Sequence, residues 1–350
     1  CVESTTSSLR SQPVNSSFQQ SKARRETSGL CFIKNQPLFA ILGILRRGMS
    51  MKEVLISFTT DSKMTWFILS LGSIVSLVGA ELATQRILTR KESLSSKTIA
   101  FLGYSLQALL TLPLLFLLPP VERFKIFEPG IFISYCTVVM LGAMGVIAYL
   151  QSFKVKNISI SIIFASLSVV VSTALGIFFF AESVTPIKFI GIGLILLAIF
   201  VLNFNNSTLE KNHFFGLLAG VIYGFSYFFD KSIVQIVHPF AYIFWIFAGL
   251  AICAFIMNPV GIIKSLHIKS VGLSKLVLVM AIGYILYNLL IFFAYSVGGE
   301  VGKIDAINNS EIFLIVLFEY FILKQKTQLS RKLIATIFAF IGIAILGFYN

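Results

Sequence analysis

The sequence predicts an all-α integral membrane protein in which ten transmembrane helices form two inverted five-helix repeats. Three observations predict this class. Only 12% of the 350 residues are charged, about half of the roughly 25% that is usual in soluble domains. Apolar runs long enough to span a bilayer recur from Met64 onward. Two long segments also resemble each other, which indicates an internal repeat.

The N-terminal segment, residues 1–63, differs from the rest of the chain. It begins with a polar, Ser-rich stretch without periodicity, which is typical of disorder. Its apolar run at 38–45 is too short to span a bilayer. Because the chain begins with Cys1 and Met49 follows later, we interpret the segment as disordered and as a candidate non-native extension.

Ten apolar runs follow, separated by short gaps rich in Pro, Gly and Asn. Helices are expected because each satisfies its own backbone hydrogen bonds in lipid, and the ten-residue alternation of a barrel is missing from the sequence. The expected spans are residues 64–83, 98–119, 130–152, 158–180, 187–204, 213–229, 239–257, 275–297, 304–323 and 332–349.

The repeat is clearest between residues 166–202 and 309–346. Each segment is a long apolar helix, a polar turn and a second apolar helix. Two pairs align at a separation of 143 residues, Ser168 with Glu311 and Glu182 with Gln325. An odd number of spans in each half inverts one repeat relative to the other in the membrane. The predicted division is 64–204 for the first repeat, 205–212 for the loop between repeats and 213–350 for the second repeat.

The segments "SLSVVVSTALGIFFFAE" and "NSEIFLIVLFEYFILKQ" carry a resemblance to a known family. Their spacing, and the glycines in the helices that follow, resemble the half-repeats of EamA-type transporters in the drug/metabolite transporter superfamily. Val169 and Ile312 replace the usual Pro, and Gln325 replaces the usual Glu of the second copy. The resemblance covers roughly residues 64–349 and implies a ten-helix carrier of small metabolites, frequently an exporter, without an ATP-binding domain.

The other sequence features favour a carrier over other classes. The net charge of +13 does not indicate nucleic-acid binding, because many Lys and Arg residues lie in short gaps between apolar runs. The 28 Lys and Arg residues divide evenly between the two sides of the expected membrane domain, so they do not determine its orientation. The cysteines and histidines form no spacing typical of a metal site. No cofactor is expected.

The predicted function is a secondary transporter, an exporter or exchanger, that moves a small organic metabolite across the plasma membrane, a bacterial inner membrane, by alternating access. Its expected partners are the solute and the lipid bilayer, with a coupling proton and a homodimer as further candidates. The alternative is a polytopic membrane enzyme that acts on a lipid-linked substrate. Such an enzyme needs clustered His, Asp or Ser, or a metal motif, and the sequence offers neither.

Glu311 is the sharpest candidate for a functional residue. A carboxylate at the centre of a spanning helix costs about 3 kcal/mol, so it is expected to face a cavity or a partner. Asn308 and Asn309 precede it and make the start of this span polar. A position near the interface, or a hydrogen bond to a neighbouring helix, is the structural alternative.

Two other expected spans carry polar residues at helical spacing. In the sixth, Tyr223, Tyr227 and Asp230 share a face with small residues, which suits either a cavity or helix packing. In the eighth, Tyr287 and Asn288 lie inside the apolar run, and a buried Asn can either bridge helices or bind a ligand. The full set of candidate substrate-binding residues is Glu311, Asn308, Asn309, Tyr223, Tyr227, Asp230, Tyr287 and Asn288. Two further carboxylates are interpreted as structural. Glu81 marks the end of the first span, and Glu182 caps or pairs near the turn after the fourth.

Overall fold

The computed structural model describes residues 62–89, 95–155, 158–182, 184–203, 211–265, 271–321 and 329–348. These residues all belong to one compact unit, Asp61–Asn350. Within them the secondary structure is helical, as the sequence predicts. The expectation of disorder for residues 1–63 falls almost wholly outside the described part of the chain.

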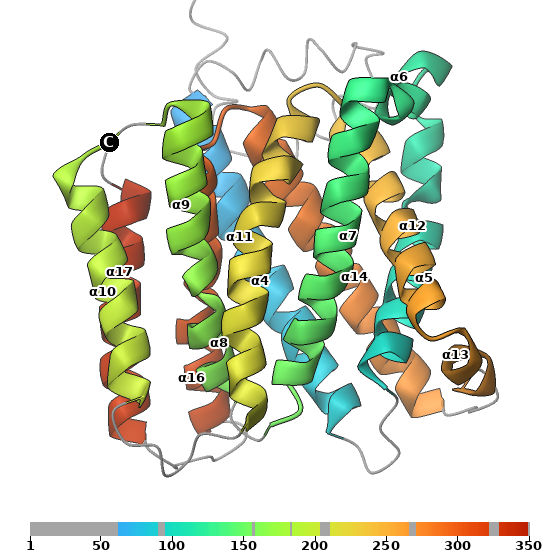
Figure 1. The fold of residues 1–350 in the computed structure, drawn as a ribbon. Helices are drawn as coiled ribbons and strands as arrows, with labels where there is room; N and C mark the ends of the chain where they lie inside the picture. The colour runs from blue at the N-terminus through green and yellow to red at the C-terminus, as the bar shows by residue number, and fades with distance from the viewer. Residues whose placement is uncertain are drawn as a thin grey trace, which may run out of the picture. The chain divides into compact units, whose positions relative to one another are not determined.

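The helices follow the expected apolar runs closely (Figure 1). In the first half they are α4 (Ser62–Leu88), α5 (Ser96–Phe116), α6 (Pro120–Phe124), α7 (Pro129–Ser152), α8 (Ile158–Ala165), α9 (Leu167–Phe180) and α10 (Pro186–Asn203). In the second half they are α11 (Phe214–Val234), α12 (Pro239–Met257), α13 (Pro259–Ser265), α14 (Val271–Ser296), α15 (Val301–Asn309), α16 (Glu311–Phe321) and α17 (Leu329–Phe348). Short 3-10 turns at Lys125–Phe127 and Lys211–His213 precede α7 and α11.

Seven stretches of described helix are long and apolar enough to cross a membrane. They are Thr65–Leu88, Ser96–Phe116, Pro129–Ser152, Ile158–Phe180, Lys211–Val234, Pro239–Met257 and Lys275–Ser296. The other three expected spans are helical in α10, in α15 with α16, and in α17, so the total of ten stays a prediction. The ninth expected span, residues 304–323, is less apolar because it contains Asp305, and its helix is interrupted at Ser310.

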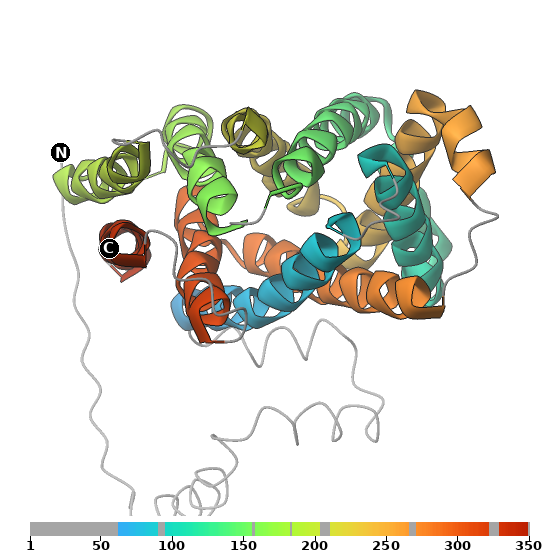
Figure 2. The same ribbon diagram turned by 90° about the horizontal axis from the view of Figure 1, so that it is seen from below.

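Helices of the first half of the chain pack in pairs against helices of the second half. The first expected span, α4, packs on the eighth, α14, and the third, α7, packs on the sixth, α11. The first span corresponds to the sixth and the third to the eighth in the two repeats, so these two pairs are equivalent contacts. The pairs α5 with α12 and α10 with α17 each join equivalent spans, and Figure 2 shows α10 and α17 side by side at one edge of the bundle. This pairing fits two repeats related by a two-fold axis.

A one-residue interruption occurs at nearly the same place in each repeat. Ser166 separates α8 from α9, and Ser310 separates α15 from α16. Their backbone angles are almost equal, φ −60° and ψ −8° at Ser166 and φ −66° and ψ −11° at Ser310. Both serines keep right-handed helical angles, so each interruption is a local tightening of one helical turn, and Ile158–Phe180 still forms one stretch long enough to span a membrane.

The close approach of α11 to α8 depends on glycine. A Cβ atom at Gly216 would lie 2.6 Å from the carbonyl oxygen of Ser161, and one at Gly220 would lie 2.6 Å from that of Ala165. Small residues are the usual means of bringing membrane helices into contact. Gly216 and Gly220 therefore serve packing, while Tyr223, further along the same helix, lines the cavity described below.

Replacement of Gly220 by Ala is expected to destabilise the protein by about 1–3 kcal/mol, because the added methyl group meets backbone that cannot rotate away. The measurement is the midpoint of thermal unfolding in detergent. Gly79→Ala is the matched control, since a Cβ atom there meets nothing within 4 Å and alanine favours a helix. Equal midpoints for the two variants would contradict the packing role of Gly220.

Candidate functional site

A cavity of about 150 Å³ lies among helices of both halves. Its walls come from α4, α5, α7, α8 and α9 of the first half and from α11, α12, α14, α15 and α16 of the second. Both interruptions border it, with Ala165 and Ser168 beside Ser166, and Asn309 and Glu311 beside Ser310. All eight residues selected from the sequence are among the residues that line this cavity.

Two carboxyl groups face each other in the cavity. The side chain of Glu311, at the start of α16, lies at hydrogen-bonding range from that of Glu81 in α4. Glu81 is fully buried and Glu311 is 4% exposed. The Tyr149 hydroxyl donates a hydrogen bond to Oε1 of Glu81, but Oε2 of each Glu accepts no hydrogen bond from the described residues. Among those residues, neither carboxyl group forms an ion pair.

This geometry corrects the interpretation of Glu81. The helix does not end there but continues to Leu88, so the carboxyl group lies well inside α4. An apolar run read from the sequence ends at its first charged residue, whereas a helix extends as far as backbone hydrogen bonds and packing support it. Glu311 is buried and lines the cavity, whereas its role in transport stays a prediction.

Asp305 in α15 is a third buried carboxylate, and its oxygens are well supplied with donors. It accepts hydrogen bonds from Oγ of Ser168 at 3.1 Å, from Oγ of Ser172 at 2.8 Å and from Nδ2 of Asn309 at 2.8 Å. The two serines belong to α9 of the first repeat. This network therefore joins the interrupted helices of the two halves beside the cavity.

Three more of the selected residues, Asp230, Asn288 and Asn308, are held in place by hydrogen bonds. Asp230 accepts a hydrogen bond from the hydroxyl of Tyr242, and Tyr227 and Tyr287 line the cavity near each other. Asn288 donates from Nδ2 to the carbonyl oxygen of Tyr284, one turn earlier, at 2.8 Å. Asn308 accepts from Oγ of Ser73 in α4 at 2.9 Å. The cavity wall is thus a polar surface positioned by neighbouring helices.

The sequence profile of the EamA-like transporter family matches the chain twice, over residues 64–204 and 211–348. The chain belongs to this family. It is a multi-pass integral membrane protein of a transporter family, as the sequence resemblance predicts. No curated protein matches the sequence.

The fold of this EamA-like protein also occurs in a solved structure titled "Crystal structure of protein". The TM-score is 0.59 and the sequence identity is 14%, with 81% of this chain and 96% of the other chain covered. At this identity the likeness concerns the fold alone.

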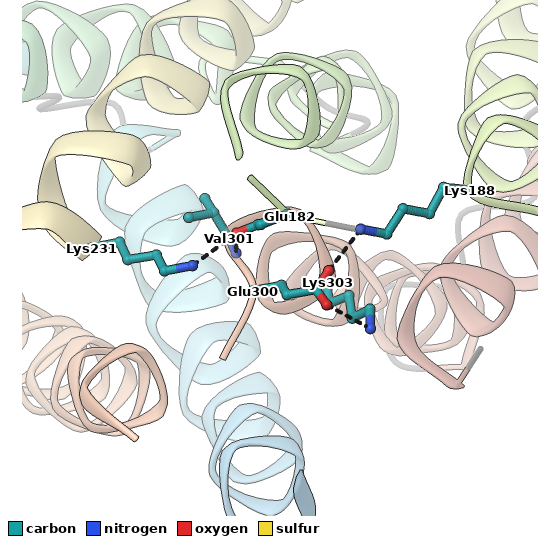
Figure 3. Close-up of polar contacts among 6 residues, drawn as sticks. All are labelled: Glu182, Lys188, Lys231, Glu300, Val301 and Lys303. Carbon is teal, nitrogen blue, oxygen red and sulfur yellow. Dashed lines mark hydrogen bonds and ion pairs between the residues drawn. The ribbon is translucent and has the colours of Figure 1, made fainter. Parts of the chain in front are cut away.

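Beyond the cavity, the EamA-like chain joins its two halves through charged side chains (Figure 3). Glu182 follows α9 and is buried, and Oε1 accepts from Nζ of Lys231 at 2.8 Å and from the backbone N–H of Val301 at 2.8 Å. A Cβ atom at Gly176 would collide with this carboxylate, so glycine makes room for it. The expectation that Glu182 pairs near the turn is confirmed.

A second group of charges lies beside the first in Figure 3. Glu300, between α14 and α15, pairs with Lys188 of α10 at 2.7 Å and with Lys303 at 3.0 Å. Burial favours the neutral form of Glu300, but the two lysines outweigh it and lower its pKa below the ordinary 4.5. Stability from these pairs is therefore complete above the ordinary pKa and is lost only as the pH falls through the lowered one. We call Glu182, Lys188, Lys231, Glu300 and Lys303 the ionic cluster.

Sequence reasoning missed Asp305 and assigned Glu81 to a boundary. Asp305 is the second residue of an expected span, where a charged residue is easily taken for the end of a loop. Its spacing held the signal, because Asp305, Asn308 and Asn309 lie at i, i+3 and i+4 on one helical face. For Glu81, no local pattern indicates that Glu311 lies opposite.

Proposed function

We propose that this chain is a secondary transporter that exports or exchanges a small organic metabolite across the plasma membrane. One observation carries the proposal, a polar cavity whose walls come from both repeats. Solute sites of secondary transporters lie between repeats, near the middle of the membrane. Membership of a transporter family supports the same conclusion. In this proposal the eight selected residues contact the solute.

The proposed mechanism is alternating access, in which one half rocks against the other around the cavity. The ionic cluster supports it, because Glu182 and Lys188 of the first half bind Lys231, Val301 and Glu300 of the second. Such contacts hold the halves together on one side of the membrane. They break when that side opens. Two copies of the chain acting as a homodimer are compatible with this cycle.

A proton is the proposed coupling ion. Glu81 and Glu311 lie face to face, and the carboxyl group of Asp305 lines the same cavity. Two adjacent carboxylates repel each other, so the pair is most stable when it shares one proton. Tyr149, Tyr284 and Tyr287 line the same cavity as this pair. Release of the proton during the cycle would tie the conformational change to the proton gradient.

The test is a comparison of solutes inside and outside cells that make the protein with those of cells that make Glu311→Gln at equal membrane abundance. We expect one small organic solute, or one chemical group of solutes, to change in distribution across the membrane with the native chain, and to change much less with Glu311→Gln. The solute found is then loaded into proteoliposomes, where flux should need the protein and respond to an imposed pH gradient.

The enzyme alternative makes a different prediction for the same cells. It requires a changed membrane lipid or lipid-linked compound and no protein-dependent flux in proteoliposomes. That result would contradict the transporter proposal.

A further inference from the structure

The charge of the cavity wall points to the class of solute. Four carboxyl-bearing residues line the cavity, Glu81, Asp230, Asp305 and Glu311, and each is at most 8% exposed. Among the described residues of this wall, none is Lys, Arg or His. A buried site of this composition stabilises positive charge and repels anions, because little water is present to screen the carboxylates.

Two of these carboxyl groups have unused acceptor atoms. Asp305 is supplied with three donors and Asp230 with the hydroxyl of Tyr242. By contrast, Oε2 of Glu81 and Oε2 of Glu311 are buried in the cavity wall without a donor from the described residues. Buried acceptors are normally satisfied. A proton satisfies this pair when the cavity is empty, and the N–H groups of a bound ammonium would satisfy it when the cavity is filled.

Aromatic rings form another part of the same wall. Tyr149, Tyr223 and Tyr227 follow one another, with ring centroids 5.5 Å apart for the first pair and 5.9 Å apart for the second. The first pair meets edge to face and the second is stacked. The other tyrosines of the cavity wall are Tyr104, Tyr284 and Tyr287. Aromatic faces attract organic cations and are the usual lining of quaternary ammonium sites.

We propose that the solute of this cavity is a small organic cation, an amine or quaternary ammonium compound held by the Glu81–Glu311 pair and the wall of Tyr149, Tyr223 and Tyr227. The inference rests on the proposed transport function and specifies the chemical class of its solute. Entry of the cation into the cavity would displace the shared proton, since both compensate the same negative charge. The proposal excludes carboxylates and phosphate esters as principal solutes.

The test uses purified full-length protein and measures thermal stabilisation and calorimetric binding with three cations, ethylammonium, tetramethylammonium and choline. Each cation is matched by a neutral molecule of similar shape, 3,3-dimethylbutan-1-ol in the case of choline. Acetate and glutarate serve as anionic probes. We expect at least one cation to bind about tenfold or more tightly than its neutral counterpart, as a desolvated cation on aromatic rings should. Binding of no cation above its neutral counterpart, or tighter binding of the anions, would overturn the proposal.

Variants of the wall separate the aromatic contact from general effects. Tyr223→Leu is expected to weaken cation binding about tenfold while it leaves the neutral probe unchanged. Tyr320→Leu is the matched control, because Tyr320 in α16 is outside the cavity wall. Equal cation affinity in the two variants would also overturn the proposal. If cations bind but proteoliposomes show no flux, the transport function fails. If the flux found is of an anion or a neutral solute, transport stands and the cation assignment fails.

Discussion

Replacement of Glu311 by Gln should yield a folded, membrane-inserted protein whose transport is about tenfold to a hundredfold slower at low solute concentration. Gln keeps the shape of Glu and can still hydrogen-bond to Glu81, but it carries no charge and releases no proton. A hydrogen bond to a charged group contributes about 1.5–3 kcal/mol, which corresponds to that range of affinity. The measurement is the initial rate of flux in proteoliposomes.

The same variant is expected to change the dependence of flux on pH. Under the proposed proton coupling, the Glu81–Glu311 pair of the native chain exchanges one proton, whereas Glu311→Gln leaves Glu81 without an acidic neighbour at hydrogen-bonding range. Glu128→Gln is the control, since Glu128 is exposed and lies outside the cavity wall. Native flux over a wide pH range in Glu311→Gln would reduce Glu311 to a structural residue that binds α16 to α4.

Replacement of Lys231 by Met is expected to destabilise the protein by about 3–5 kcal/mol. The side chains of Lys231 and Glu182 are 6% and 3% exposed, so Met leaves an almost fully buried carboxylate without its cation. The backbone N–H of Val301 would remain as its donor. The measurement is thermal unfolding in detergent. Lys125→Met is the control, because Lys125 and Glu122 are partly exposed and 4.0 Å apart, and such pairs contribute about 0–1 kcal/mol.

A double variant identifies the cause. Lys231→Met combined with Glu182→Gln removes both charges and keeps an acceptor for the N–H of Val301. Most of the lost stability should return, because replacement of both members of a buried ion pair is often nearly neutral. If the double variant is no more stable than Lys231→Met alone, the loss comes from packing of the Lys side chain, which also lies 4.5 Å from the ring centroid of Phe180.

The apolar runs, their repeat and the choice of polar residues within them were readable from the sequence. Bilayer thickness sets the length of a span, and the cost of burying a charge or amide in lipid is high at each position separately. Glu311 and Asn308 therefore stood out without any knowledge of their neighbours. The family resemblance rested on the same kind of local pattern, and the match to the EamA-like family bears it out.

Only the tertiary structure brought these residues together. Glu81 and Glu311 are 230 positions apart, and Lys231 reaches Glu182 from a different repeat. Such contacts depend on how helices pack, which is decided by shape complementarity such as that between Gly220 and the backbone of Ala165. A local sequence pattern shows that burying a carboxyl group costs free energy, but it does not show which side chain offsets that cost. The sequence by itself therefore determined that polar residues lie within the membrane domain, and packing decided that they form one acidic, aromatic cavity.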